Sequence, residues 1–212
     1  DAVDVVLPRR SKPMCDVPAM RSGNKPIDDG NYLFTPEQRK DFIALEPNSE
    51  KFFKRWLGGD EFINGIERWY LWLGDCAPAQ LRAMPHAMKR VQAVQKFRQS
   101  SKSPPTRALA ATPTRFHTEF ISEGRYIALP QVSSERRNTI PISFLDSSVL
   151  CGDKLRVIDE ASLYHFGVLC SVMHMAWTRQ VCGRLESRYQ YSALIVYNNY
   201  PWPEQPTPAQ KQ

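Results

Sequence analysis

The stretch SLYHFGVLCSVMHMAWTRQVCGRLESRYQY, residues 162–191, decides the fold. Its first part, residues 162–185, is a long apolar run that ends near Gly183, and this pattern predicts a buried central helix. Its second part, residues 186–191, alternates polar side chains mainly with tyrosines, and strand character is predicted from there to residue 197. A helix that leads into a strand, without the regular strand–helix–strand rhythm of a parallel sheet, is typical of an α+β protein.

The clearest helix start lies at Thr35. Thr35 suits the N-cap position, Pro36 suits the first turn, and Gln38 completes a capping box. These signals predict a helix over residues 35–45. A short second helical segment is expected over residues 46–57.

An Asn-Gly pair marks a predicted hairpin over residues 61–73. Asn64-Gly65 is the preferred pair for a tight turn, and aromatic and branched residues follow it as in a strand. Further strands, one of them after a turn, are predicted in the second half of the chain, over residues 125–132, 139–145 and 148–159.

Residues 76–118, between the predicted hairpin and the later strands, contain no Asp or Glu. The whole chain has a formal net charge of only +6. A helix over residues 79–102 would turn a stripe of Met84, Met88, Val91 and Val94 toward the core. A localised basic field of this kind is typical of a protein with a polyanionic partner, and the alternative is a solvated basic face. The basic residues of the stretch are Arg82, Lys89, Arg90, Lys96, Arg98, Lys102, Arg107 and Arg115.

The length of 212 residues allows one large domain or two small ones. We expect residues 1–30 to be a linker or strap, residues 31–200 the folded domain, and residues 201–212 a Pro-rich exit linker. The sequence has no initiator Met, no signal-peptide layout and no window apolar enough for a membrane span. Five cysteines without CxxC spacing suit reduced thiols, so we expect a cytoplasmic piece of a longer protein.

Motifs for catalysis are missing from the sequence. No Gly-rich turn of the dinucleotide or methyl-donor kind follows a predicted strand, and there is no P-loop. The segment NNYPWP, residues 198–203, differs from the Asn-Pro-Pro-aromatic motif of amino-methylating enzymes because Tyr200 separates Asn199 from Pro201. A rigid exit segment that packs its aromatic rings on the domain explains it better.

Four residues of metal-binding type fall on the predicted central helix. Four ligands on a single helix cannot converge on one tetrahedral ion, so packing and local hydrogen bonds explain them better than zinc does. We therefore predict neither a catalytic residue nor a cofactor or metal site in this chain. The residues concerned are His165, Cys170, His174 and Cys182.

The segment SSERRN, residues 133–138, predicts a phosphate-binding loop. It offers two hydroxyls and two adjacent guanidinium groups, whose planar fork suits phosphate oxygens. The alternative is a surface loop in which Glu135 partly neutralises the arginines. Together with the basic helix, the predicted phosphate-binding residues are Lys89, Arg90, Lys96, Arg98, Lys102, Ser133, Ser134, Arg136 and Arg137.

If residues 186–191 are extended, Glu186, Arg188 and Gln190 point to one side. Side chains two apart on a strand stand about 6.5–7 Å apart, which long side chains can close onto neighbouring base edges. Glu accepts from the amino group of cytosine and Arg donates to guanine, so the two together can read one C·G pair, and Gln prefers adenine. The alternative is an ordinary Glu–Arg ion pair on the face of a strand.

Five segments together resemble the target-recognition domain of the MmeI-like restriction–modification enzymes, which are single-chain type IIG/IIL proteins. The resemblance covers residues 30–203, nearly the whole chain. The segments are FINGIERWYLWL, RVQAVQKF, PQVSSERRNTIPISFL, SLYHFGVLCSVMHMAWTRQVCGRLESRYQYS and VYNNYPWP.

The resemblance implies a parent protein that joins a nuclease, a helical connector, an adenine-specific DNA methyltransferase and this domain. The methyltransferase would lie just upstream, so residues 1–30 would be a linker or strap from that methyltransferase domain. This chain would bind double-stranded DNA and choose the sequence, with the methyltransferase of the same polypeptide as its partner. S-adenosylmethionine would be bound by that methyltransferase and not by this chain.

The resemblance also implies which residues read bases. The pair matching Glu186 and Arg188 varies together in the family: relatives with Lys and Asp there read the inverted base pair, and the Glu/Arg version is similar to members that specify C. A second variable pair matches Lys154 and Gln190. Many relatives carry Arg in place of Gln190, which leaves the second base open, although Lys154 could favour guanine.

Two other functions remain open from the sequence. The first is a non-specific nucleic-acid-binding domain, for RNA or DNA, or a scaffold, which predicts no sequence preference on duplex DNA and no need for Glu186. The second is a stand-alone enzyme that uses Cys170 or His174, which predicts activity or a bound metal in the isolated chain.

Overall fold

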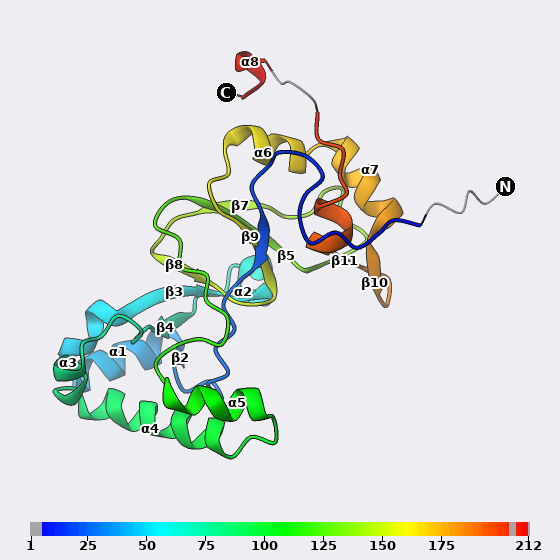
Figure 1. The fold of residues 1–212 in the computed structure, drawn as a ribbon. Helices are drawn as coiled ribbons and strands as arrows, with labels where there is room; N and C mark the ends of the chain where they lie inside the picture. Colours follow the sequence, from blue (N-terminus) through cyan, green and yellow to red (C-terminus); the bar gives the residue numbers. More distant parts are fainter. Residues whose placement is uncertain (1–5, 204–206, 212) are drawn as a thin grey trace. The chain divides into compact units, whose positions relative to one another are not determined.

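The computed structural model describes residues 6–203 and 207–211 (Figure 1). The chain divides into two compact units, and each is assembled from more than one segment. Unit 1 comprises residues 1–22, 122–147 and 154–212, and unit 2 comprises residues 23–121 and 148–153. The chain therefore crosses between the units four times. The mixture of helices with mainly antiparallel sheets confirms the predicted α+β class.

Unit 1 is built on a four-stranded antiparallel sheet with the strand order β1-β9-β5-β7. The central strand β5 is buried along its whole length and gives Ile127 and Leu129 to the core. The edge strand β1 lies within residues 1–30, the predicted linker, so this part of the segment belongs to a sheet. The strands are β1 (Met20–Ser22), β5 (Tyr126–Pro130), β7 (Ser143–Leu145) and β9 (Leu155–Ile158).

A second, three-stranded antiparallel sheet in unit 1 has the order β10-β11-β6. Its outer pair, β10 and β11, forms a hairpin, and β6 directly follows the buried strand β5 in the sequence. The hairpin is therefore attached to the main sheet of the unit through β6. The strands are β6 (Val132–Ser133), β10 (Gly183–Leu185) and β11 (Arg188–Gln190).

The apolar run of residues 162–185 forms two helices, α6 (Leu163–Leu169) and α7 (Val172–Val181), before β10 begins. The prediction of one helix is wrong because the Ser171 hydroxyl accepts from the backbone N–H of His174 and starts a new helix as its N-cap. Helix α7 buries one face only, since Met173 on its other face remains 72% exposed.

The last part of unit 1 also departs from the predicted strand. Residues Ala193–Tyr197 form a single π-helical segment, η3, which gives Val196 and Tyr197 to the core. A short helix, α8 (Pro208–Lys211), follows. The predicted end segments, residues 1–30 and 201–212, include residues 1–5, 204–206 and 212, which lie outside the described residues.

Side-chain amides join the two ends of unit 1. The Asn199 amide nitrogen donates to the Pro8 carbonyl at 3.0 Å, and its amide oxygen accepts from the Arg10 guanidinium at 2.9 Å. Tyr200 and Trp202 are buried in the same core. Residues 198–203 thus pack their aromatic rings on the domain, as the interpretation of NNYPWP as a rigid segment predicts.

Unit 2 contains a four-stranded sheet with the order β2-β4-β3-β8, in which only β3 and β8 run parallel. Its core is aromatic: Trp56 stacks on Tyr70 with ring centroids 5.0 Å apart, and Trp72 stacks on Phe116 at 4.6 Å. The strands are β2 (Leu33–Phe34), β3 (Phe53–Leu57), β4 (Trp69–Leu71) and β8 (Val149–Cys151).

The helices of unit 2 surround this sheet. The capping box at Thr35 is confirmed, because the Thr35 hydroxyl accepts from Gln38 N and the Gln38 side chain accepts from Thr35 N. The second helical segment is a short 3₁₀ helix that leads into β3. The helices are α1 (Pro36–Leu45), η1 (Pro47–Phe52), α2 (Gly59–Asn64), α3 (Pro78–Arg82), α4 (Pro85–Gln99), α5 (Pro104–Ala108) and η2 (Leu109–Ala111).

The predicted hairpin at Asn64-Gly65 is wrong. Asn64 ends helix α2, and Gly65, with φ 67°, is its left-handed C-cap. Both a tight turn and a helix C-cap require positive φ at glycine, so the same pair suits either structure.

The predicted basic helix is interrupted at Pro85, which begins α4 as a separate helix after α3. A proline fits the first turn of a helix because its missing N–H has no helical partner there. The predicted core stripe is confirmed: Met84, Val91 and Val94 are buried and Met88 is half-buried. No helix in the described ranges is long and apolar enough to span a membrane.

Candidate nucleic-acid interface

The hairpin of β10 and β11 turns at Glu186-Ser187, between the paired residues Leu185 and Arg188. Glu186 has φ 56° and so lies in the turn. The prediction that residue 186 is extended is therefore wrong, because a two-residue hairpin loop needs positive φ. Arg188 and Gln190 do lie on one strand, two residues apart, as predicted.

Glu186 and Arg188 contact each other across the turn. The Arg188 Nη2 donates to the Glu186 Oε2 at 2.9 Å, while the two side chains are 45% and 79% exposed. An exposed ion pair of this kind contributes little to stability. One hydrogen bond also leaves most of the acceptor sites of a carboxylate and most of the five N–H groups of a guanidinium free for a partner.

The second predicted pair, Lys154 and Gln190, lies beside the same hairpin. Gln131 connects them: its N–H donates to the Lys154 carbonyl at 2.8 Å, and its carbonyl accepts from Tyr191 N at 2.7 Å. The strand pairing places Gln190 opposite Val132, one residue after Gln131. The structure thus brings all four predicted base-reading residues to one region of unit 1.

The SSERRN segment begins at Ser133, the last residue of β6, which lies opposite Tyr189 of the hairpin. Arg136 extends into solvent, with a side chain that is 91% exposed. Ser133 is buried, and its hydroxyl accepts from Arg137 Nη1 at 3.4 Å. Its prediction as a direct phosphate contact is therefore wrong, and Ser133 instead orients Arg137. The Ser134 hydroxyl accepts from Arg136 N.

The prediction that Arg98 binds phosphate is also wrong. Arg98 is 1% exposed, and the N–H groups of its guanidinium donate to five backbone carbonyls at 2.8–3.0 Å. Five is the full donor capacity of an arginine side chain. The acceptors are the carbonyls of Pro26, Ile27, Leu109, Thr112 and Arg115.

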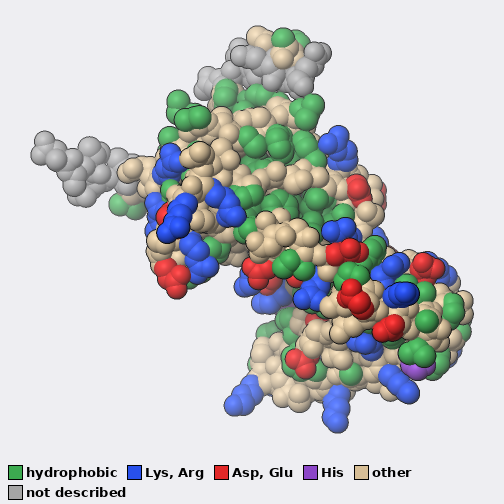
Figure 2. All heavy atoms as spheres, turned by 180° about the vertical axis from the view of Figure 1, so that it is seen from behind, with side chains coloured by type: hydrophobic (Ala, Val, Ile, Leu, Met, Phe, Trp, Pro, Cys, Tyr) green, Lys and Arg blue, Asp and Glu red, His purple; other side chains and the backbone are tan. Residues whose placement is uncertain are grey.

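The remaining basic residues of this helix differ in exposure. Arg90 is half-buried, with its Cζ 4.2 Å from the centroid of the Phe34 ring, and burial lowers the pKa of its guanidinium. Lys89, Lys96 and Lys102 are exposed. On unit 1, Figure 2 shows basic and acidic side chains gathered on the side where Figure 1 places β10 and β11. Because they are exposed, Lys89, Lys96 and Lys102 are the candidates for phosphate contacts from unit 2.

Two residues beside the hairpin were missed by the sequence reasoning. Arg184 lies with its Cζ 4.1 Å from the centroid of the Tyr189 ring. Glu135 lies two residues after Ser133, the partner of Tyr189, and so is level with Ser187 in the turn. Its own backbone N–H and, after it, Ser187 help to lower the pKa of the Glu135 carboxyl. Arg184 and Tyr189 are cross-strand partners in the hairpin, and this pairing is the sequence signal for their contact. The pairing can be predicted only once the turn is placed at Glu186-Ser187.

The histidine side chains of α6 and α7 pack and hydrogen-bond within unit 1. His174 is buried, its Nε2 lies 2.9 Å from the Tyr191 hydroxyl, and burial lowers its pKa to about 4. The His165 ring contacts the N-cap Ser162. Across residues 6–203 and 207–211, no group of three or more His, Cys, Asp or Glu side chains is arranged to hold a metal ion.

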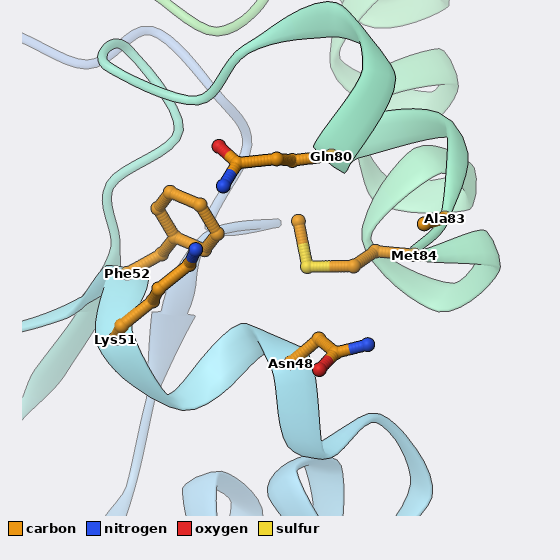
Figure 3. A pocket seen from close by; sticks show the side chains of 6 residues that line it. All are labelled: Asn48, Lys51, Phe52, Gln80, Ala83 and Met84. Carbon is orange, nitrogen blue, oxygen red and sulfur yellow. The ribbon is translucent and has the colours of Figure 1, made fainter.

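A pocket in unit 2 offers little chemistry. It has a cavity volume of about 230 Å³, and Figure 3 shows Met84 reaching into it between Asn48 and Gln80. The amide oxygen of Gln80 already accepts from Ala77 N at the start of α3. The lining includes no carboxylate, thiol or imidazole, and Lys51 is its ionisable side chain. The lining residues are Asn48, Lys51, Phe52, Gln80, Ala83 and Met84.

An exposed polar hairpin beside an arginine loop offers a surface suited to a polyanionic partner. The family described as "MmeI, target recognition domain" matches residues 1–204, and the chain belongs to this family. DNA methyltransferase A of Bacillus subtilis (strain 168) is 35% identical over 204 residues, which cover 96% of this chain and 23% of that protein.

A solved relative agrees with this assignment. The structure of the type IIL restriction–modification enzyme MmeI in complex with DNA is 47% identical, with a TM-score of 0.95 over 100% of this chain and 28% of that chain. The chain thus spans about a quarter of the length of these relatives. The predicted resemblance is confirmed.

Proposed function

We propose that this chain binds double-stranded DNA sequence-specifically, as the recognition domain of a longer restriction–modification DNA methyltransferase. Family membership and the DNA complex of the solved relative support the choice of partner. The observation that carries the proposal is the exposed Glu186–Arg188 pair on a two-residue turn. The remainder of the polypeptide would hold S-adenosylmethionine and transfer the methyl group, with adenine as the methylated base.

The pair would read one C·G base pair jointly. In the free chain the two side chains hydrogen-bond to each other, and on DNA each can retain that bond while it contacts a base edge. The Glu186 carboxylate would accept from the cytosine amino group, and the Arg188 guanidinium would donate to guanine. Gln190 and Lys154, which lie on either side of Gln131, would read a second base pair.

Phosphate contacts would fix the position of the domain on the duplex. On unit 1 we assign them to Ser134, Arg136 and Arg137, which adjoin the hairpin. On unit 2 we assign them to the exposed lysines of α4 and of the following loop, Lys89, Lys96 and Lys102.

The test exchanges the charges of the reading pair in the full-length polypeptide. Glu186→Lys with Arg188→Asp should invert one C·G pair of the methylated motif, as measured by genome-wide mapping of methylated sites. A matched control is Glu123→Lys with Arg125→Asp, because these residues have the same spacing and precede β5 in the same unit. A motif that stays the same in the first variant contradicts the base-reading assignment.

The exposed lysines of unit 2 also suit a non-specific nucleic-acid-binding domain. That function predicts equal affinity for duplexes of any sequence, and no effect of Glu186→Ala on the selection of sites. Competition between duplexes with and without the mapped motif distinguishes the two functions.

A further inference from the structure

The turn that carries Glu186 adopts a backbone conformation that its own residues do not favour. Glu186 has φ 56°, in the left-handed region that is unfavourable for a non-glycine residue. Such conformations persist when surrounding contacts hold them. The Glu186 side chain is 79% exposed and bonded to Arg188, which lies in the same hairpin. In addition to the pairing of β10 with β11, neighbours of the turn restrain it.

Arg184 provides one such restraint. Its guanidinium lies over the ring of Tyr189, which is only 5% exposed and so offers a fixed platform. From this position Nη1 donates to the Ser187 carbonyl at 3.4 Å, and Nη2 donates to the Arg179 carbonyl at 3.3 Å. Arg179 belongs to the last turn of α7. Arg184 thus connects the second residue of the turn to the end of a packed helix.

Glu135 provides the other restraint, from the opposite side of the small sheet. Ser133 pairs with Tyr189, so the same register brings Glu135, two residues further on, level with Ser187, the same turn residue. The Glu135 carboxylate lies 3.9 Å from the Arg136 guanidinium. Its own backbone N–H, then the Ser187 hydroxyl and the charges of Arg136 and Arg184 lower the pKa of this carboxyl. Glu135 therefore joins the arginine loop to the hairpin, a role beyond partial neutralisation of the arginines.

We propose that Glu135 and Arg184 are positioning residues for base recognition, which hold the Glu186-Ser187 turn through Ser187. Neither side chain contacts a base in this assignment. Glu135 also pairs with Arg136. The loop of residues 133–138, which adjoins the phosphate backbone, is therefore coupled to the Glu186-Ser187 turn, which reads the base. The inference rests on the proposed function of Glu186 and Arg188.

The test compares Glu135→Ala with Glu135→Gln in the full-length polypeptide. Discrimination is measured as the ratio of affinities for the mapped duplex and for duplexes with one base pair changed. Glu135→Ala should lower this ratio about tenfold at the base pair assigned to Glu186 and Arg188, within the range that one bidentate contact supplies. Glu135→Gln keeps an oxygen that can accept from Ser187 and should retain most of the ratio.

A matched control removes the same charge elsewhere in unit 1. Glu123 is exposed, and Glu123→Ala should leave the ratio unchanged at every position. Removing an acid strengthens non-specific attraction to DNA, so lower discrimination without lower overall affinity separates positioning from loss of folding. Thermal unfolding of each variant checks folding independently.

Arg184→Ala and Ser187→Ala test whether the other residues of this network also hold the Glu186-Ser187 turn. Both should lower discrimination at the same base pair, and Glu135→Ala combined with Ser187→Ala should cost no more than either alone, because one hydrogen bond is removed in all three. An unchanged ratio in both Glu135→Ala and Arg184→Ala overturns the proposal, as does an equal loss at every base pair. The proposed function fails separately, when the exchange at Glu186 and Arg188 leaves the motif unchanged.

Discussion

Replacing Arg98 with Met should strongly destabilise unit 2. Met has nearly the length and helix propensity of Arg, so the change removes the guanidinium and little else. The five carbonyls that accept from Arg98 lie before β2 and after α5, at opposite ends of the long first segment of unit 2. The guanidinium therefore ties two connecting segments to helix α4.

The magnitude follows from the number of bonds. A hydrogen bond contributes about 1 kcal/mol net, and more when the donor is charged, so five lost bonds amount to about 5 kcal/mol. A whole domain is stable by about 5–15 kcal/mol, so the loss is comparable with the total. Arg98→Lys keeps the charge but has three N–H donors on one nitrogen, and should recover only part of the loss.

Urea unfolding followed by tryptophan fluorescence measures this effect, since Trp56 and Trp72 lie in the core of unit 2. The matched control is Lys96→Met, two residues away on α4 and exposed, which should change stability by less than about 0.5 kcal/mol. A cost below about 1 kcal/mol for Arg98→Met would refute the reasoning. So would a normally stable Arg98→Met variant whose DNA binding had become less dependent on salt, because that result would restore the phosphate contact.

Three further outcomes are expected. Lys96→Ala should reduce the slope of log affinity against log salt by about 0.9 without changing the free energy of unfolding, as measured by DNA titration at several salt concentrations. The free energy of unfolding should fall by up to about 3 kcal/mol between pH 6.5 and pH 4, because unfolded His174 takes up a proton near 6.5 whereas burial lowers its folded pKa to about 4. His174→Gln should remove most of this dependence in urea unfolding across that range. Thr35→Ala should cost about 1 kcal/mol and Thr35→Ser much less, as measured by thermal unfolding, because only the first loses the N-cap oxygen.

Sequence-based predictions were more often correct where a feature depends on residues that are close together in the sequence. The capping box at Thr35 and Gln38 involves residues three apart, and it was predicted correctly. The Asn64-Gly65 pair is equally local, but its positive φ suits both a hairpin and a helix end, and the choice depends on how the flanking residues pack. The class of the fold followed from the mixture of signals and needed no exact boundaries.

The candidate site shows the same limit. Glu186 and Arg188 could be selected from their chemistry and from the family resemblance, since they are only two residues apart in the sequence. The burial of Arg98 could not be predicted, because its acceptors at Pro26 and Thr112 come from segments that only the folded unit brings together. The contact of Glu135 with Ser187 likewise depends on the pairing of β6 with β11.

Because the chain crosses between its units four times, some strands can pair only after later segments have been synthesised. Strand β1, made early, must wait for β9, and β3 must wait for β8, so both sheets have unpaired edges while the ribosome makes the intervening residues. Such long-range pairing slows folding and leaves nascent chains prone to aggregation. The hairpin with Glu186 emerges after all the other strands. A nascent chain is thus able to complete both of its larger sheets before it has any means of distinguishing one DNA sequence from another.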